Sequence, residues 1–78
     1  MTKEDYYFQG MDLFTGDNLE EAVRAYQNAL KDDPAYADAL HALAMTYAQL
    51  DRVDEAIEAG KKLIEIAPED ELAYTSLS

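Results

Sequence analysis

The amino-acid sequence predicts an all-α fold built from repeated helical hairpins, and three observations carry that prediction. Apolar residues recur at three- and four-residue spacing through most of the chain, as they do on one face of a helix. Pro34 and Pro68 are predicted to end helices, because proline lacks a backbone N–H donor. The two prolines lie 34 residues apart, and we call this interval the repeat period. Core-type positions also keep their character when the sequence is shifted by one repeat period, as with Val23 and Ile57.

The first helix is predicted over about residues 3–15. Thr2 and Asp5 have the spacing of a capping box, in which a hydroxyl and a carboxylate each accept a backbone N–H at the helix start. We expect Gly16 to end this helix in the left-handed conformation that glycine adopts without strain. Asn18 is then expected to cap the helix that follows.

Apolar spacing predicts three more helices, over about residues 19–31, 36–50 and 53–67. Acidic residues cluster at helix starts and breaks, where capping and the positive end of the helix dipole account for them. A short C-terminal helix over residues 71–78 completes the predicted secondary structure.

The 34-residue helix–turn–helix period resembles that of the tetratricopeptide repeat family. The resemblance implies a right-handed α-solenoid in a single domain, residues 1–78. Its parts are a first repeat over about 3–36, a second over about 37–70, and a partial third repeat or capping helix over 71–78. The positions that match the family best are Tyr6, Gly10, Ala22, Tyr26, Ala29, Pro34, Leu40, Ala44, Tyr47, Ala56 and Pro68.

Three positions depart from the family pattern. Gly16 stands one residue before the place where the family usually has its turn glycine. Gly60 stands where a large aromatic residue is usual, and Leu63 where a small alanine is usual. We interpret the second and third departures as a volume swap across one helical turn, which cores tolerate when total volume is kept.

The face of the first helix that would meet a preceding repeat is polar, and it consists of Asp5, Gln9 and Asp12. The positions one repeat period later are mostly apolar, namely Ala39, Leu43 and Thr46. Terminal repeats need a polar outer face, so the first repeat is predicted to be an N-terminal cap. The chain stops partway through a repeat, which leaves two alternatives: it is a fragment of a longer array, or two chains complete each other.

The chain is strongly acidic, with 17 acidic residues against 6 basic ones and a net charge of −11. Such a chain repels nucleic acid and anionic membranes, so the expected partners are basic or neutral. No cysteine is present, which excludes disulfides and thiolate sites. The N-terminus has no signal-peptide pattern and no apolar run is long enough for a membrane span, so a soluble cytoplasmic protein is the default expectation.

In the tetratricopeptide repeat family, the first helix of each repeat lines a concave groove. The resemblance implies a groove here that is apolar and rich in methionine and aromatic residues, with an acidic rim. Its candidate partner-binding residues are Tyr7, Met11, Phe14, Asp38, His41, Met45 and Gln49. The alternative interpretation is that some of these side chains only pack between helices, as such stripes usually do.

Many members of the family grip a partner's C-terminal carboxylate with Lys, Asn and Arg in this groove. The matching positions here carry no such residues, so the clamp is absent; they are Tyr7, Met11, Ala42, Leu72 and Ser76. His41 is the only histidine, and a metal site needs three or four ligands, so neither a metal nor another cofactor is expected. No arrangement of residues supports catalysis.

The sequence therefore predicts a binding module that takes a peptide or helix, basic or amphipathic in character, from another protein. The alternative is a structural module that forms homo-oligomers through an open C-terminal face. The candidate residues for that self-association are Leu63, Ile66, Tyr74 and Leu77.

Overall fold

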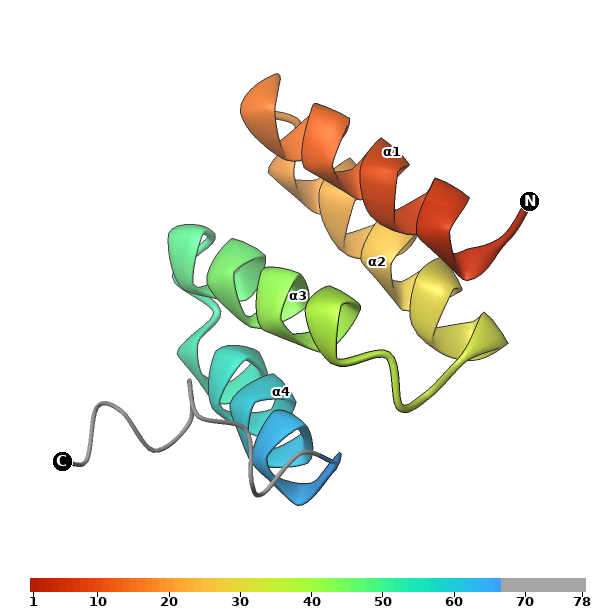
Figure 1. The fold of residues 1–78 in the computed structure, drawn as a ribbon. Helices are drawn as coiled ribbons and strands as arrows, with labels where there is room; N and C mark the ends of the chain where they lie inside the picture. The colour runs from red at the N-terminus through yellow and green to blue at the C-terminus, as the bar shows by residue number, and fades with distance from the viewer. Residues whose placement is uncertain (67–78) are drawn as a thin grey trace, which may run out of the picture.

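A computed structural model of the chain describes residues 1–66, which form four helices (Figure 1). These helices are α1 (Lys3–Thr15), α2 (Leu19–Asp32), α3 (Ala37–Gln49) and α4 (Val53–Ile66). No strand occurs in this part of the chain, and the all-α prediction is confirmed. Up to residue 66, the predicted helix bounds lie within one residue of the observed ones, and the helix predicted over 71–78 lies outside the described residues.

The helices pair into two hairpins, α1 with α2 and α3 with α4, which stack side by side through α2 and α3 (Figure 1). A smaller contact joins α1 to α3, so these two helices line one face of the molecule together. None of the four described helices is long and apolar enough to cross a membrane.

The backbone repeats itself with the same period as the sequence. Each bound of α3 and α4 lies one repeat period after the matching bound of α1 and α2. In the turn between α1 and α2, the Asn18 N–H donates to the Leu13 carbonyl at 2.8 Å. In the turn between α3 and α4, the Arg52 N–H donates to the Tyr47 carbonyl at 2.9 Å. Both bonds are the six-to-one bond of a Schellman motif. The sequence period therefore extends to individual backbone hydrogen bonds.

An aspartate, not a glycine, takes the left-handed position of each turn. Asp17 has φ 65° and Asp51 has φ 64°. The prediction for Gly16 is wrong, since its φ is −83°. A Schellman motif places its left-handed residue one position after the helix cap, and Gly16 is the cap itself. Aspartate tolerates this conformation better than most residues because its short polar side chain can bond locally.

The two predicted N-caps have different outcomes. The capping box at Thr2 is confirmed: the Asp5 N–H donates to the Thr2 hydroxyl at 3.3 Å and the Thr2 N–H donates to the Asp5 carboxylate at 3.0 Å. The bond from the Thr2 N–H is the largest influence that lowers the pKa of Asp5, and the Thr2 side chain also lowers it. The cap predicted at Asn18 is wrong, because no side-chain bond forms there. Its ψ of 65° is far from the 170° of Thr2, which gives its side chain a different orientation.

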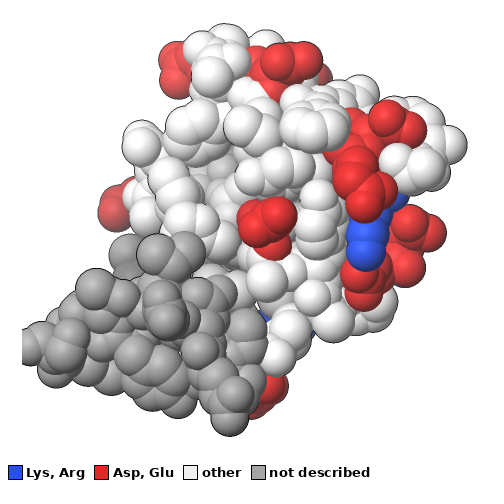
Figure 2. All heavy atoms as spheres, viewed as in Figure 1, with Lys and Arg blue, Asp and Glu red and all other residues white. Residues whose placement is uncertain are grey.

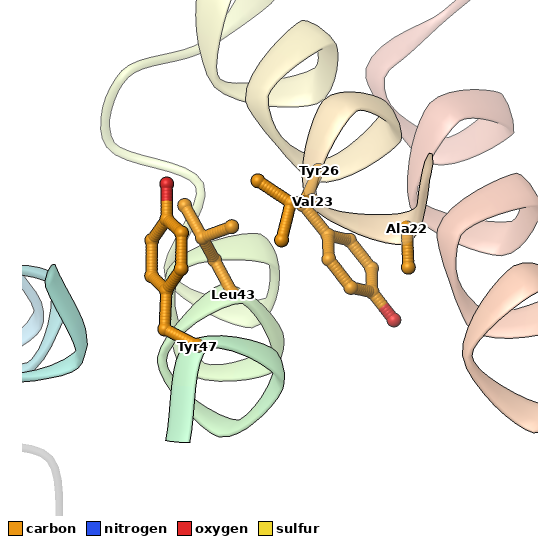
Figure 3. Packing of buried hydrophobic residues seen from close by; sticks show 5 residues of the cluster. All are labelled: Ala22, Val23, Tyr26, Leu43 and Tyr47. Atoms are coloured by element: carbon orange, nitrogen blue, oxygen red, sulfur yellow. The ribbon is translucent and has the colours of Figure 1, made fainter. Parts of the chain in front are cut away.

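The core lies between the two hairpins and is formed by α2 and α3. Its central cluster consists of Ala22, Val23, Tyr26, Leu43 and Tyr47 (Figure 3). By contrast, α1 and α4 each bury a single residue, Gly10 and Ala59. The inner helices therefore carry most of the packing, and the outer helices lie against them.

A close contact between α1 and α2 fixes the first hairpin. A Cβ on Gly10 would lie 2.5 Å from the nearest ring carbon of Tyr26, so only glycine fits there. The position one repeat period after Tyr26 is Gly60, and no described atom lies within 4 Å of where its Cβ would be. The volume swap between Gly60 and Leu63 stays a prediction.

The outer face of α1 is polar, as predicted for an N-terminal cap, and its three exposed residues are Asp5, Gln9 and Asp12. The equivalent residues of α3 are buried, and they are Ala39, Leu43 and Thr46. The Thr46 hydroxyl satisfies its hydrogen-bonding need by donating to the Ala42 carbonyl at 2.8 Å.

Candidate partner-binding groove

The face formed by α1 and α3 contains a hollow of about 240 Å³, which we call the groove. Its lining is mostly apolar and consists of Tyr7, Met11, Phe14, Thr15, Tyr26, His41, Ala42 and Met45. Figure 2, drawn in the same view as Figure 1, shows mainly uncharged surface between α1 and α3. Acidic groups stand at the edges of this surface and at one place within it.

Helical spacing places the groove side chains on one surface. Met11 on α1 and Met45 on α3 remain 43% and 48% exposed although they line a hollow. Methionine is flexible and polarisable, so exposed methionines adapt to apolar side chains of different shapes. Two such residues on opposite walls indicate a surface that can accept an apolar group.

Aromatic rings form the base of the groove. The ring of Tyr7 lies 6.0 Å from that of Tyr26 and 5.7 Å from that of Tyr36, both in tilted arrangements. Tilted aromatic pairs at these distances are stabilising. Burial raises the pKa of Tyr26, whose side chain is only 2% exposed. The base is therefore fixed, while the methionine walls can adjust.

An ion pair ties the start of α1 to the α2–α3 junction beside the groove. The Lys3 ammonium lies 2.6 Å from the Asp33 carboxylate and 5.0 Å from the centre of the Tyr36 ring. The other Asp33 oxygen accepts the Ala35 N–H at 3.1 Å. Both bonds lower the pKa of Asp33, and the bond from Lys3 has the larger influence. The bond to Asp33 also raises the pKa of Lys3. The contacts help to hold α1 and α3 at a fixed separation.

The structure brings five of the seven predicted groove residues together around the hollow, and these are Tyr7, Met11, Phe14, His41 and Met45. Asp38 and Gln49 are exposed on α3 but are not part of the lining.

Three lining residues were not among the predicted site residues, and they are Thr15, Tyr26 and Ala42. Tyr26 is one of the positions that match the family pattern, and Gly10, which lies opposite it, is the sequence signal that its ring passes close to α1. Ala42 occupies one of the clamp positions, together with Tyr7 and Met11. The places that would hold basic or amide groups in a carboxylate clamp thus carry apolar groups around this hollow.

Titratable groups near the groove are sparse. Within residues 1–66, no group of three His, Cys, Asp or Glu residues is arranged to hold a metal ion. His41 is exposed at the groove wall, three residues from Asp38 on the same helix. The chemistry of this site is therefore that of apolar contact with an acidic surround.

The two predicted self-association residues that the structure describes lie on α4, which contributes no residue to the groove lining. Leu63 is half-buried and Ile66 is 36% exposed, whereas Tyr74 and Leu77 lie outside the described residues. Three residues of α4 are more exposed than Ile66 but were not among the predicted self-association residues: Val53 is 55% exposed, Ile57 51% and Ile64 56%. A shift by one repeat period could have found them, because it pairs them with the apolar α2 residues Leu19, Val23 and Leu30, of which the last two belong to the core or pack against it.

Comparison with known protein families finds one match that covers most of the chain. A family model described as "Tetratricopeptide repeat" matches residues 7–71. A comparison with curated proteins finds no match.

Proposed function

The chain belongs to the tetratricopeptide repeat family, whose repeats generally mediate protein–protein interaction, and on that premise we propose that its groove binds a segment of a partner protein. The family is typically a non-enzymatic interaction module. The observation that carries the proposal is the apolar hollow between α1 and α3, with Met11 and Met45 half-exposed on its walls.

The size of the hollow supports a single anchoring side chain. Ligand pockets for small molecules usually measure about 300–1,000 Å³, and this one measures about 240 Å³. An aromatic or long aliphatic side chain of the partner, inserted between Met11 and Met45, would cover both methionines. Buried anchors of this kind carry most of the energy in protein interfaces.

The charge of the chain supports a basic partner. A net charge of −11 creates a negative potential around the molecule, and Asp38 stands exposed on α3 near the groove. Opposite charge on the partner raises the association rate and fixes orientation more than it adds affinity. The proposed ligand is therefore an amphipathic segment with one bulky apolar residue and basic residues beside it.

Titration with short peptides tests the proposal. The chain contains no tryptophan, so a peptide with one tryptophan flanked by lysines reports binding through its own fluorescence. We expect saturable binding that weakens as salt rises from about 50 to about 500 mM, because salt screens the charges. A peptide with glutamates in place of the lysines should bind at least about tenfold more weakly.

Matched variants locate the site on the molecule. Met45→Gln should weaken binding, because it replaces an apolar wall of the groove by a polar one. Phe8→Gln changes another exposed apolar residue of α1 that does not line the groove, and it should have no effect. Equal binding by both variants would show that the peptide binds elsewhere.

Self-association remains the second candidate function. Exposed apolar residues on α4 favour it, since Val53, Ile57 and Ile64 are each more than half exposed. This function would use a different surface from the groove, so the two candidates are compatible.

A further inference from the structure

Four residues form a continuous stripe along α4, which we call the α4 stripe: Val53, Ile57, Gly60 and Ile64. Their spacings of four, three and four residues are those of the apolar seam of a coiled coil. The three aliphatic members are 51–56% exposed. Single exposed apolar residues are ordinary, but a straight seam of them marks a surface for another helix.

In the first hairpin, the residue equivalent to Ile57 is covered by a neighbouring helix and is buried. Val23, the α2 counterpart of Ile57, is 5% exposed because it packs in one cluster with Leu43 and Tyr47 of α3. Among the described residues, no helix covers the α4 stripe in that way.

The outer face of α1 cannot be the cover in a head-to-tail assembly. The surface that α1 would present to the α4 stripe of another copy carries Asp5, Gln9 and Asp12, all exposed. Burying two unpaired carboxylates against an aliphatic seam is unfavourable. The α4 stripe of a second copy has no charged member and so fits this surface better, and pairing of like surfaces is the arrangement of a two-fold symmetric dimer.

We propose that α4 pairs antiparallel with α4 of a second copy of the chain, across a two-fold axis between residues 58 and 59. This pairing places Ile57 opposite the partner's Gly60 and Val53 opposite the partner's Ile64. Apart from its chain neighbours and the backbone of its own helix, no described atom lies within 4 Å of the Cβ position of Gly60, so there is space for the Ile57 side chain of the second copy. The stripe is thus complementary to itself when one copy is reversed.

Charges beside the stripe agree with the same pairing. Asp54 and Lys61 lie on one side of the stripe, each one residue after a stripe position. In the antiparallel pair, Asp54 lies near the partner's Lys61, and the symmetry repeats this contact. The other side carries Ala56 and Leu63, which are apolar. Opposite charges on one flank of an apolar seam select the orientation of paired helices.

The dimer is expected to be weak and to strengthen with salt. One helix packed against one helix forms an interface at the small end of the range for specific complexes. Each copy also carries a net charge of −11, so the two copies repel each other until salt screens them. This behaviour is opposite to that expected for peptide binding in the groove, which lies on α1 and α3 and does not depend on the dimer.

Sedimentation velocity of the whole chain, from about 10 to about 500 µM, measures the association directly. We expect the average mass to rise towards that of a dimer, and to rise further at high salt. Ile57→Gln removes two copies of the central contact and should raise the dissociation constant at least about tenfold. Met45→Gln makes the same chemical change at an exposed groove residue and should leave the mass unchanged.

Charge reversal tests the antiparallel register. Asp54→Lys should weaken the dimer even though it lowers the net negative charge, and Lys61→Asp should also weaken it. Combining both changes should restore association. Circular dichroism of each variant checks that the helices remain formed.

Three results would overturn the proposal: a monomer at all concentrations, dimerisation that Ile57→Gln leaves unchanged, or a double charge reversal that fails to restore association. A monomer would leave the groove proposal untouched, because peptide titration at low protein concentration reports on it separately.

Discussion

The two hairpins have the same backbone but different packing where α1 meets α2 and where α3 meets α4. In the first, the Tyr26 ring lies so close to Gly10 that a Cβ added there would force the ring to move. In the second, the equivalent positions are Gly60 and Ala44, and the space beside Gly60 is open to the described residues. The turns nevertheless keep the same hydrogen bonds. Backbone repetition is therefore set by the turns and helix lengths, whereas packing depends on individual side chains.

A second difference between the hairpins concerns their neighbours. Val23 is buried because the second hairpin covers it, whereas Ile57, its equivalent, is 51% exposed. A β-branched aliphatic residue is thus a core residue in one hairpin and a surface residue in the other. Position in the array, and not the residue itself, decides which of these it becomes.

The largest effect on stability is expected from removing the aromatic ring of Tyr26, which the second hairpin lacks. Tyr26→Ala should lower the free energy of unfolding by about 3–5 kcal/mol, the usual cost of deleting a buried aromatic side chain. Urea unfolding followed by circular dichroism measures it. Met45→Ala, at a 48%-exposed position, should change stability by less than about 0.5 kcal/mol. Similar losses from both variants would contradict the account of the core.

Adding one methyl group to each hairpin should give effects of opposite sign. Gly10→Ala forces the Tyr26 ring to move and should destabilise the protein by about 1–3 kcal/mol. Gly60→Ala meets no described atom and improves helix propensity, so it should stabilise by up to about 1 kcal/mol. The midpoint of urea unfolding separates the two. Changes of the same sign in both variants would show that the hairpins pack alike.

The turns should respond equally, because they are the part that the hairpins share. Asp17→Gly and Asp51→Gly each relieve a left-handed aspartate and should raise stability by about 0.5–1 kcal/mol. Gly16→Ala, at a negative φ, serves as the control, since no left-handed backbone is involved there. Thermal unfolding tests this expectation. A loss of stability in either aspartate variant would argue that its side chain makes a needed contact.

The smallest effect concerns the Lys3–Asp33 pair, which the second hairpin lacks because its equivalent residues are Ala37 and Ala67. The pKa of Asp33 is lowered in the folded protein, so its contribution is present above the unfolded pKa of about 3.9. That contribution is lost as the pH falls through the folded pKa. The protein should therefore be more stable than Asp33→Asn at pH 7, and this difference in stability should shrink progressively as the pH falls below about 4.

Thermal unfolding across this pH range makes the comparison, and Asp32→Asn is the control at an exposed neighbour. A difference between the wild-type protein and Asp33→Asn that did not shrink as the pH was lowered would assign the effect to something other than the ionised carboxylate.

The sequence was sufficient for the helices and the repeat but not for every detail within them. Apolar spacing and two prolines defined the helix bounds to within one residue. The turn was misassigned at Gly16 because residue preference alone does not show which turn position is left-handed. Tyr26 contributes to both core and groove, and a one-dimensional pattern assigns it to only one of them. The exposure of Ile57 depends on whether a neighbouring helix is present, which apolar character does not reveal.

The central claim is that the groove binds a partner segment, and the methionine methyl groups test it most directly. The chain has three methionines: Met11 and Met45 line the groove, and Met1 lies outside it and is 76% exposed. In a protein with ¹³C-labelled methionine methyls, titration with the basic tryptophan peptide should shift the Met11 and Met45 signals together and leave Met1 in place. Saturable binding that leaves both groove signals unmoved would contradict the claim.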